Sequence, residues 1–269
     1  MSNMSVLVDT NMIIYFSKIE KAISEGIAPL TKLRQLLSEK EAVAVNNIYD
    51  NVKNGNIKPV ITSTVYEELF IPSRNDSTRY AYPVTVEFIK NYCSLILPTK
   101  EFEEKFAIQS QNLAQKYKDR KLFPKEGDNK DSIIMAQASI AGGYKMISLK
   151  NLNSTNVLTF EQQVKESGVV VENEAEKLLT ANKLVTANLK DFVTFKVQEG
   201  RNTYTAREII VEENKKELGE ENVVTPTLPS EFVLDKEYLN ATSQNKEVVE
   251  HSLMNNDKAK LGEDKTSKG

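Results

Sequence analysis

Short, nearly continuous apolar runs alternate with longer helical patterns along the first 180 residues of the chain. The apolar runs cover residues 5–9, 59–62, 94–97, 145–149 and 168–171. Such runs are typical of strands that are covered on both faces, as in parallel sheets. Between them lie amphipathic stretches such as residues 101–118, in which Phe102, Phe106, Leu113 and Tyr117 are candidate core residues. Strands that alternate with helices need crossover connections, so the sequence predicts an α/β fold with a central parallel sheet.

The pattern changes near residue 182, and we expect three regions. Residues 1–182 form the α/β domain, residues 183–239 a hairpin and linker extension, and residues 240–269 a tail. Alternating apolar and polar residues at 191–197 and 204–211 predict the β-hairpin. The tail is rich in Ser, Asn, Lys and Glu, a composition typical of disorder.

Composition excludes several classes of chemistry. The chain has 269 residues and a formal net charge of -3, so any nucleic-acid contact must come from a local basic patch. Cys93 is the only cysteine and His251 the only histidine, which argues against disulfides, cysteine-rich zinc sites and histidine-dependent triads. No apolar stretch is long enough to span a membrane, and no signal peptide is seen at the N-terminus, so a cytoplasmic protein is expected.

Three acidic residues stand where strands end or helices begin. Asp9 closes the first apolar run, Glu68 lies in the helical pattern that follows the second run, and Asp131 opens a long apolar helix. Carboxylates at such positions can converge at one edge of a parallel sheet, where they repel one another unless a cation lies among them. Hard divalent ions such as Mg²⁺ prefer oxygen ligands of this kind. The trio therefore points to metal-dependent phosphodiester chemistry.

Four short segments, in this order, resemble the motifs of the PIN (PilT N-terminal) nuclease family. They are residues 6–11, 63–69, 131–138 and 145–149. The resemblance implies a three-layer α/β/α sandwich around the parallel sheet and an endoribonuclease that uses Mg²⁺ or Mn²⁺. It also implies an RNA substrate and, for toxin members of the family, an antitoxin protein as partner. Homodimers are common in the family, and the hairpin extension is a candidate dimer contact.

Carried over to this chain, the resemblance makes Asp9, Glu68 and Asp131 catalytic residues and metal ligands. The family usually has a further Asp just after the fourth strand, whereas Asn153 best matches that position here. A neutral oxygen ligand would weaken the charge of the site, and Asp128 is a candidate to compensate for it as a further metal ligand.

A second segment competes for the fourth position. Residues 184–192 resemble the fourth motif more closely in their letters and would supply Asp191. This alternative requires residues 150–183 to be an insertion. We favour Asn153, because residues 160–179 read as the helix, strand and helix expected after the fourth site.

Each acidic residue also has a purely structural interpretation. Asp9 can serve simply as a helix N-cap, which stabilises a helix by about 0.5–2 kcal/mol relative to Ala. Glu68, like its neighbour Glu67, can be a solvated carboxylate on a helix face. Asp128 and Asp131 can both be acids at a helix start, where the helix dipole favours negative charge.

Candidate RNA contacts are Asn11, which can also orient Asp9, and three basic residues, Arg74, Arg79 and Lys130. Contacts from such side chains to phosphates position a nucleic acid without reading its sequence. For any single one of these basic residues, a solvated surface charge is the more common interpretation. Single-stranded or looped RNA is the expected substrate, since its splayed bases are open to side chains.

Two rival functions remain. A catalytically impaired PIN-like module that binds RNA or assists assembly is favoured by the missing fourth acid and by the long extension. An aspartyl-nucleophile phosphotransferase also begins with a strand that ends in Asp, but such enzymes need a second Asp two residues on, where this chain has Asn11.

Overall fold

The computed structural model describes most of the chain in nine stretches. These are residues 4–70, 82–98, 102–122, 130–143, 147–151, 181–188, 190–220, 223–244 and 246–263. Four of the residues expected to carry chemistry lie outside these stretches, and they are named below with the site.

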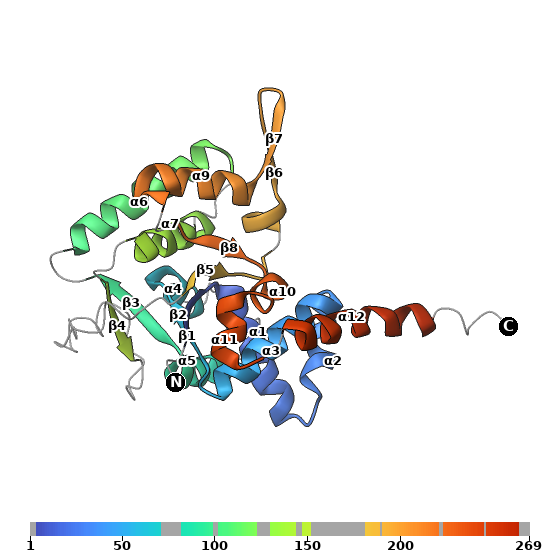
Figure 1. Ribbon diagram of the computed structural model, residues 1–269. Coiled ribbons are helices and arrows are strands. Elements are labelled where there is room, and N and C mark those ends of the chain that lie inside the picture. Colours follow the sequence, from blue (N-terminus) through green and yellow to red (C-terminus); the bar gives the residue numbers. More distant parts are fainter. Residues whose placement is uncertain are drawn as a thin grey trace.

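A six-stranded sheet forms the centre of the molecule (Figure 1). Its strands are β1 (Met4–Val8), β2 (Ile57–Ile61), β3 (Ser94–Pro98), β4 (Ile147–Asn151), β5 (Ala181–Val185) and β8 (Thr225–Thr227). They are arranged in the order β4-β3-β2-β1-β5-β8. Five of them run parallel, and β4 pairs antiparallel with β3 at one edge. The parallel central sheet predicted from the sequence is confirmed, with an antiparallel strand added to it.

Helices cover both faces of the sheet, which gives the expected three layers (Figure 1). On one side lie α1 (Thr10–Ser24), α2 (Pro29–Arg34), α3 (Glu39–Lys53) and α5 (Tyr82–Tyr92). On the other lie α6 (Glu103–Asp119), α7 (Lys130–Gly143) and α9 (Ala206–Leu218), while α4 (Ser63–Phe70) contacts α1, α7 and β3. Every residue of β1 is buried, as expected for an apolar strand between two helical layers.

The region after residue 182 is more closely tied to the sheet than the sequence indicates. The boundary expected at residue 182 falls inside β5, which pairs with β1 on one side and with β8 on the other. Residues 183–239 therefore include two strands of the central sheet and are not a separate extension. Within them, the helix α9 replaces the second half of the strand expected at residues 204–211.

The expected hairpin is present. It consists of β6 (Lys196–Glu199) and β7 (Asn202–Thr205), which pair antiparallel around a turn at Gly200 and project from the body (Figure 1). Gly200 has a φ of 61°, a backbone conformation that glycine adopts at little steric cost. A short π-helical turn, η2 (Lys190–Thr194), connects β5 to the hairpin.

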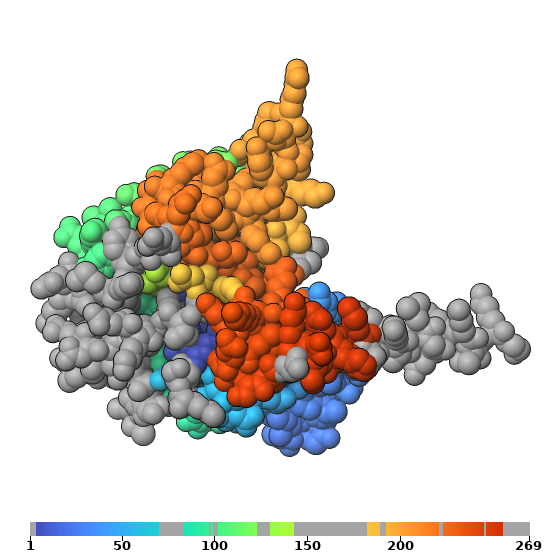
Figure 2. Space-filling model, in the orientation of Figure 1, coloured from blue at the N-terminus to red at the C-terminus, as the bar shows by residue number. Residues whose placement is uncertain are grey.

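The prediction of a disordered tail from residue 240 is wrong for most of that region. Three helices follow β8, namely α10 (Pro229–Phe232), α11 (Lys236–Thr242) and α12 (Lys246–Glu263). Both α10 and α12 pack on α3, and Figure 2 shows the C-terminal helices lying against the N-terminal part of the chain. Val249 and Leu253 of α12 are each only 5% exposed. Two apolar residues four positions apart form one helix face, so α12 docks even though its composition is polar.

No helix in the described stretches is sufficiently long and apolar to traverse a lipid bilayer.

Candidate active site

Asp9 occupies the carboxyl end of the central strand β1. It is the N-cap of α1, and its side chain is only 1% exposed. Oδ1 accepts a hydrogen bond from the backbone N–H of Thr10 at 2.7 Å. Oδ2 accepts one from the Thr186 hydroxyl at 2.9 Å and a longer one from the Asn11 amide at 3.4 Å. Asp9 therefore does cap the helix, and it also accepts hydrogen bonds that a cap alone would not need.

Burial raises the pKa of the Asp9 carboxyl above its ordinary value, because the ionised form loses solvation. The hydrogen bonds from Thr186, Thr10 and Asn11 act in the opposite direction and stabilise the charged form. Within the described stretches no Lys, Arg or His side chain forms an ion pair with Asp9. The result is a buried acid that is held by neutral donors.

Glu68 is joined to Asp9 through Thr10. The Thr10 hydroxyl donates to a Glu68 carboxylate oxygen, while the Thr10 backbone N–H donates to Asp9. Glu68 is half-buried, whereas its neighbour Glu67 is exposed. The two predicted acids from β1 and α4 therefore share one threonine, although 58 positions separate Glu68 from Thr10.

Asp131 is the second residue of α7 and is half-buried. Further along this helix, Gln137 donates to Ser63 Oγ at 3.0 Å and accepts from the Thr64 N–H at 3.3 Å. These bonds fix α7 against the start of α4. Across the described residues, however, no group of three or more His, Cys, Asp or Glu side chains is arranged to hold a metal ion. The structure thus brings Asp9 and Glu68 together and does not add a third acid to them.

Several predicted site residues lie outside the described stretches. They are Asp128, Asn153, Arg74 and Arg79. Of the remaining candidates for RNA contact, Asn11 touches Asp9, and Lys130 is exposed at the first position of α7.

The strand expected to precede the fourth motif is in a different place from the one predicted. Residues 147–151 form β4 at the edge of the sheet, antiparallel to β3, and Asn151 pairs with Ser94, the first residue of β3. The carboxyl end of β4 therefore lies beside the amino-terminal ends of the parallel strands. Asp9 lies on the opposite side of the sheet, at the carboxyl-terminal ends of those strands.

The strand that does end beside Asp9 is β5. Val185 accepts a hydrogen bond from the Asp9 backbone N–H at 3.0 Å, and the next residue is Thr186, which is fully buried. The Thr186 hydroxyl also accepts from the Asn188 N–H at 3.0 Å, so the loop after β5 is shaped around the contact with Asp9. The competing assignment, residues 184–192, agrees better with this topology, and its backbone continues to Asp191 in η2. The preference for Asn153 rests on the elements expected at residues 160–179, which lie outside the described stretches.

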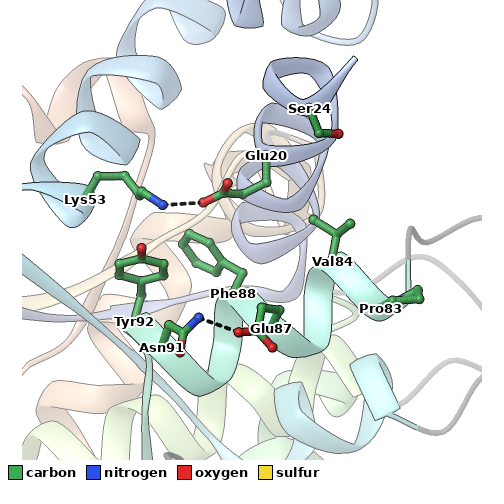
Figure 3. A pocket seen from close by; sticks show the side chains of 9 residues that line it. All are labelled: Glu20, Ser24, Lys53, Pro83, Val84, Glu87, Phe88, Asn91 and Tyr92. Atoms are coloured by element: carbon green, nitrogen blue, oxygen red, sulfur yellow. Dashed lines mark hydrogen bonds and ion pairs between the residues drawn. The ribbon is translucent and has the colours of Figure 1, made fainter. Parts of the chain in front are cut away.

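A cavity of about 460 Å³ lies at the other end of α1 from Asp9, between α1 and α5, with α3 at one end (Figure 3). Lys53 forms an ion pair with Glu20 at 2.8 Å and lies 4.4 Å from the centre of the Tyr92 ring. The cavity contains none of the predicted site residues. The residues that line it are Glu20, Ser24, Lys53, Pro83, Val84, Glu87, Phe88, Asn91 and Tyr92.

No protein-family model, curated protein or solved structure matches the chain, so its own geometry must support any assignment.

Proposed function

We propose that the protein is a divalent-metal-dependent endoribonuclease whose active centre is built on Asp9 and Glu68. The observation that carries the proposal is the Asp9 carboxylate. It is 1% exposed at the end of the central strand, it has no cationic partner in the described stretches, and it is linked through Thr10 to Glu68. A bound cation would stabilise the ionised form of such a buried carboxylate, because its positive charge would offset the solvation that the carboxylate loses on burial.

The donor atoms fit Mg²⁺ or Mn²⁺, which prefer oxygen ligands. A carboxylate has about four lone-pair positions, and the hydrogen bonds from Thr10, Thr186 and the Asn11 side chain fill three of those on Asp9. Asp9 and Glu68 would hold the ion, and water would fill its remaining positions, since no third acid, Asp131 included, is grouped with these two among the described residues. When bound, such an ion lowers the pKa of a coordinated water and stabilises charge on the phosphate.

The other residues near Asp9 position it. Thr186 and Asn11 donate to Oδ2 and restrict rotation of the carboxylate, and Thr10 fixes Glu68 relative to it. Removal of a group that hydrogen-bonds to a metal ligand often changes metal affinity or activity about 10- to 100-fold. RNA is the proposed substrate, and single-stranded or looped regions are the accessible ones.

The test is cleavage of a structured RNA in Mn²⁺. We expect cleavage by the wild-type protein, loss of cleavage in EDTA, and loss in both Asp9→Asn and Glu68→Gln. Glu67→Gln is the matched control, because Glu67 is an exposed carboxylate next to Glu68 on the same helix. Wild-type cleavage by Asp9→Asn would reject the proposal.

A thermal-shift titration addresses the metal separately. Mn²⁺ should raise the melting temperature of the wild-type protein and have a smaller effect on Asp9→Asn, because a ligand stabilises the state that binds it. RNA binding without a metal shift or cleavage would support instead the catalytically impaired RNA-binding or assembly module.

The cellular setting belongs to the same proposal. An RNA substrate implies a cytoplasmic protein, and the buried free thiol of Cys93 is compatible with a reducing compartment. If the nuclease is a toxin, a small antitoxin encoded beside it should block cleavage when it is added to the purified protein. Homodimer formation through the hairpin would be measured by sedimentation of the wild-type protein.

A further inference from the structure

One face of α1 carries a polar and aromatic stripe that begins at the acidic centre. The stripe consists of Asn11, Tyr15 and Lys18, which are spaced four and three residues apart and are all half-buried. Residues at these spacings are neighbours on one side of a helix. Asn11 contacts Asp9 directly at 3.4 Å, so the stripe starts at the carboxylate. Tyr15 lies about 9 Å along the helix from Asp9, and Lys18 about one turn beyond Tyr15.

Tyr15 and Lys18 are close enough to act together. The Lys18 ammonium nitrogen lies 5.9 Å from the centre of the Tyr15 ring, within the range of a cation–π contact. Burial, followed by the negative charge of Asp9, raises the pKa of the Tyr15 hydroxyl, so the ring lies within electrostatic reach of the acid. An aromatic ring beside an ammonium group is the usual means of holding single-stranded nucleic acid, because bases stack on the ring and phosphates attract the cation.

We propose that Tyr15 is a stacking platform for an RNA base next to the bond to be cleaved, and that Lys18 contacts a backbone phosphate of the same strand. The proposal rests on the endoribonuclease function, since it assigns the path of the substrate that Asp9 would act on. Because every base has a π face, stacking on Tyr15 grips single strands with little sequence preference. A duplex cannot offer an unstacked base to the ring, so this stripe selects single-stranded or looped RNA.

A second aromatic–lysine pair provides a matched control. Tyr92 and Lys53 lie beside the cavity of Figure 3, where the ammonium is 4.4 Å from the ring centre. That lysine is paired with Glu20, and the pair lies near the end of α1 that is remote from Asp9. The Tyr92–Lys53 pair has the same ring and ammonium chemistry as Tyr15 and Lys18 but lies away from Asp9, so it should contribute nothing to RNA binding at the proposed site.

The experiment measures the binding of a fluorescent single-stranded RNA by anisotropy, with EDTA present and in an Asp9→Asn background so that nothing is cleaved. Tyr15→Phe keeps the ring and should bind within about twofold of the parent. Tyr15→Leu removes the ring and should weaken binding by about tenfold or more. Lys18→Gln should reduce the slope of log K against log salt by about 0.7, the value for one phosphate contact on a single strand.

Three results would overturn the proposal: no measurable RNA binding by the parent, equal binding by Tyr15→Leu and Tyr15→Phe, or an equal loss in Tyr92→Leu. Since Tyr15 also packs against the core, the melting temperature of each variant is measured. If Tyr15→Leu does not fold, the salt dependence of RNA binding by Lys18→Gln tests the proposal instead.

The stacking proposal and the nuclease proposal can fail separately. If the wild-type protein does not cleave RNA but RNA binding depends on Tyr15, the nuclease proposal is rejected and the stacking proposal stands. If the protein with Asp9 cleaves RNA and Tyr15→Leu changes neither cleavage nor binding, only the stacking proposal is rejected.

Discussion

At the scale of single residues, Asp9 is an acid whose burial destabilises the folded protein at neutral pH. Its folded-state pKa is raised above the ordinary value of 3.8, so the folded protein favours the protonated form more than the unfolded chain does. Stability from this group is therefore present at low pH and is lost as pH rises through the raised pKa. A residue that is kept at such a position despite its cost is a candidate for a functional role.

Replacement of Asp9 by Asn should therefore stabilise the metal-free protein at pH 7. The amide has no charge to desolvate, and the Thr186 hydroxyl, which donates to Oδ2 of Asp9, can also accept a hydrogen bond. The gain in melting temperature should shrink as pH falls towards 3.8 and below, because Asp9 then becomes protonated in the unfolded state as well as in the folded state. Thermal unfolding of both proteins in EDTA, from pH 4 to 8, measures this difference. A lower melting temperature for Asp9→Asn at pH 7 would contradict the expectation.

Thr186→Val should impair the proposed activity with little change of volume at the site. Loss of the hydroxyl removes a hydrogen bond that lowers the pKa of Asp9, so the acid limb of the pH–rate profile should move to higher pH. A decrease of about 10- to 100-fold in kcat/KM is expected from the loss of an orienting group. Thr186→Ser, which keeps the hydroxyl, is the control and should retain the wild-type profile. An unchanged profile for Thr186→Val would show that this hydroxyl does not position Asp9.

At the scale of secondary-structure elements, local sequence patterns located the elements better than they located their partners. The apolar runs correctly predicted β1, β2 and β3, and the helical pattern at residues 101–118 correctly predicted α6. The partners of β4 and β5 could not be predicted in this way, because a hydrophobic run does not indicate which strand it will pair with. β4 pairs with β3, whereas β5 pairs with β1 and β8. Each of β4 and β5 contains one Lys and one Asn, so their apolar content does not indicate that β5 occupies the more central place.

For the candidate site, the sequence predicted that two acidic residues would lie close together, but it did not predict all of their hydrogen-bond partners. Asp9 and Glu68 were chosen from their positions at a strand end and in a helix, and the structure links them through Thr10. Thr186 was missed as a site residue because its contact with Asp9 spans 177 positions and depends on the parallel pairing of β5 with β1. Knowledge of the strand order, rather than of any local motif, was needed to find it.

Close packing between two elements leads to a prediction at Gly142. A Cβ atom at this position of α7 would lie 2.2 Å from a methyl carbon of Val224, the residue just before β8. Ala is normally favoured over Gly in a helix by about 1 kcal/mol. Here we expect Gly142→Ala to destabilise the protein by about 1–3 kcal/mol, because Val224 is fully buried and its branched side chain is stiff.

Urea unfolding would measure this cost, and a double-mutant cycle would identify its source. Val224→Ala should relieve the clash, so the two substitutions together should cost less than the sum of their separate effects. Additive effects would mean that the destabilisation by Gly142→Ala has another origin.

At the scale of the whole molecule, the C-terminal helices complete the fold instead of trailing from it. β8 closes one edge of the sheet, and α10 and α12 pack on α3. A buried polar contact fixes the same region, since the Asn51 amide of α3 donates to the Tyr238 hydroxyl of α11 at 3.0 Å. The N-terminal and C-terminal parts of the chain therefore share one hydrophobic core.

The docking of α12 is tested by variants on its two faces. Val249→Asp and Leu253→Asp should release the helix, because each substitution places a carboxylate where the native side chain is only 5% exposed. Hydrogen exchange in α12 and α3 should then increase. Val248→Asp and Met254→Asp, whose side chains are 63% and 64% exposed, should leave stability within about 0.5 kcal/mol. Equal effects from both pairs would mean that α12 does not dock through the face described.

The pairing of β5 with β1 has a consequence for the order of events during synthesis on the ribosome. Asp9 leaves the ribosome 177 residues before Thr186, its hydrogen-bond donor. Chains fold as they are translated, and contacts between distant segments form late. A nascent protein therefore holds Asp9 without the Thr186 donor until β5 has left the exit tunnel, and the proposed catalytic competence would arise only after that point.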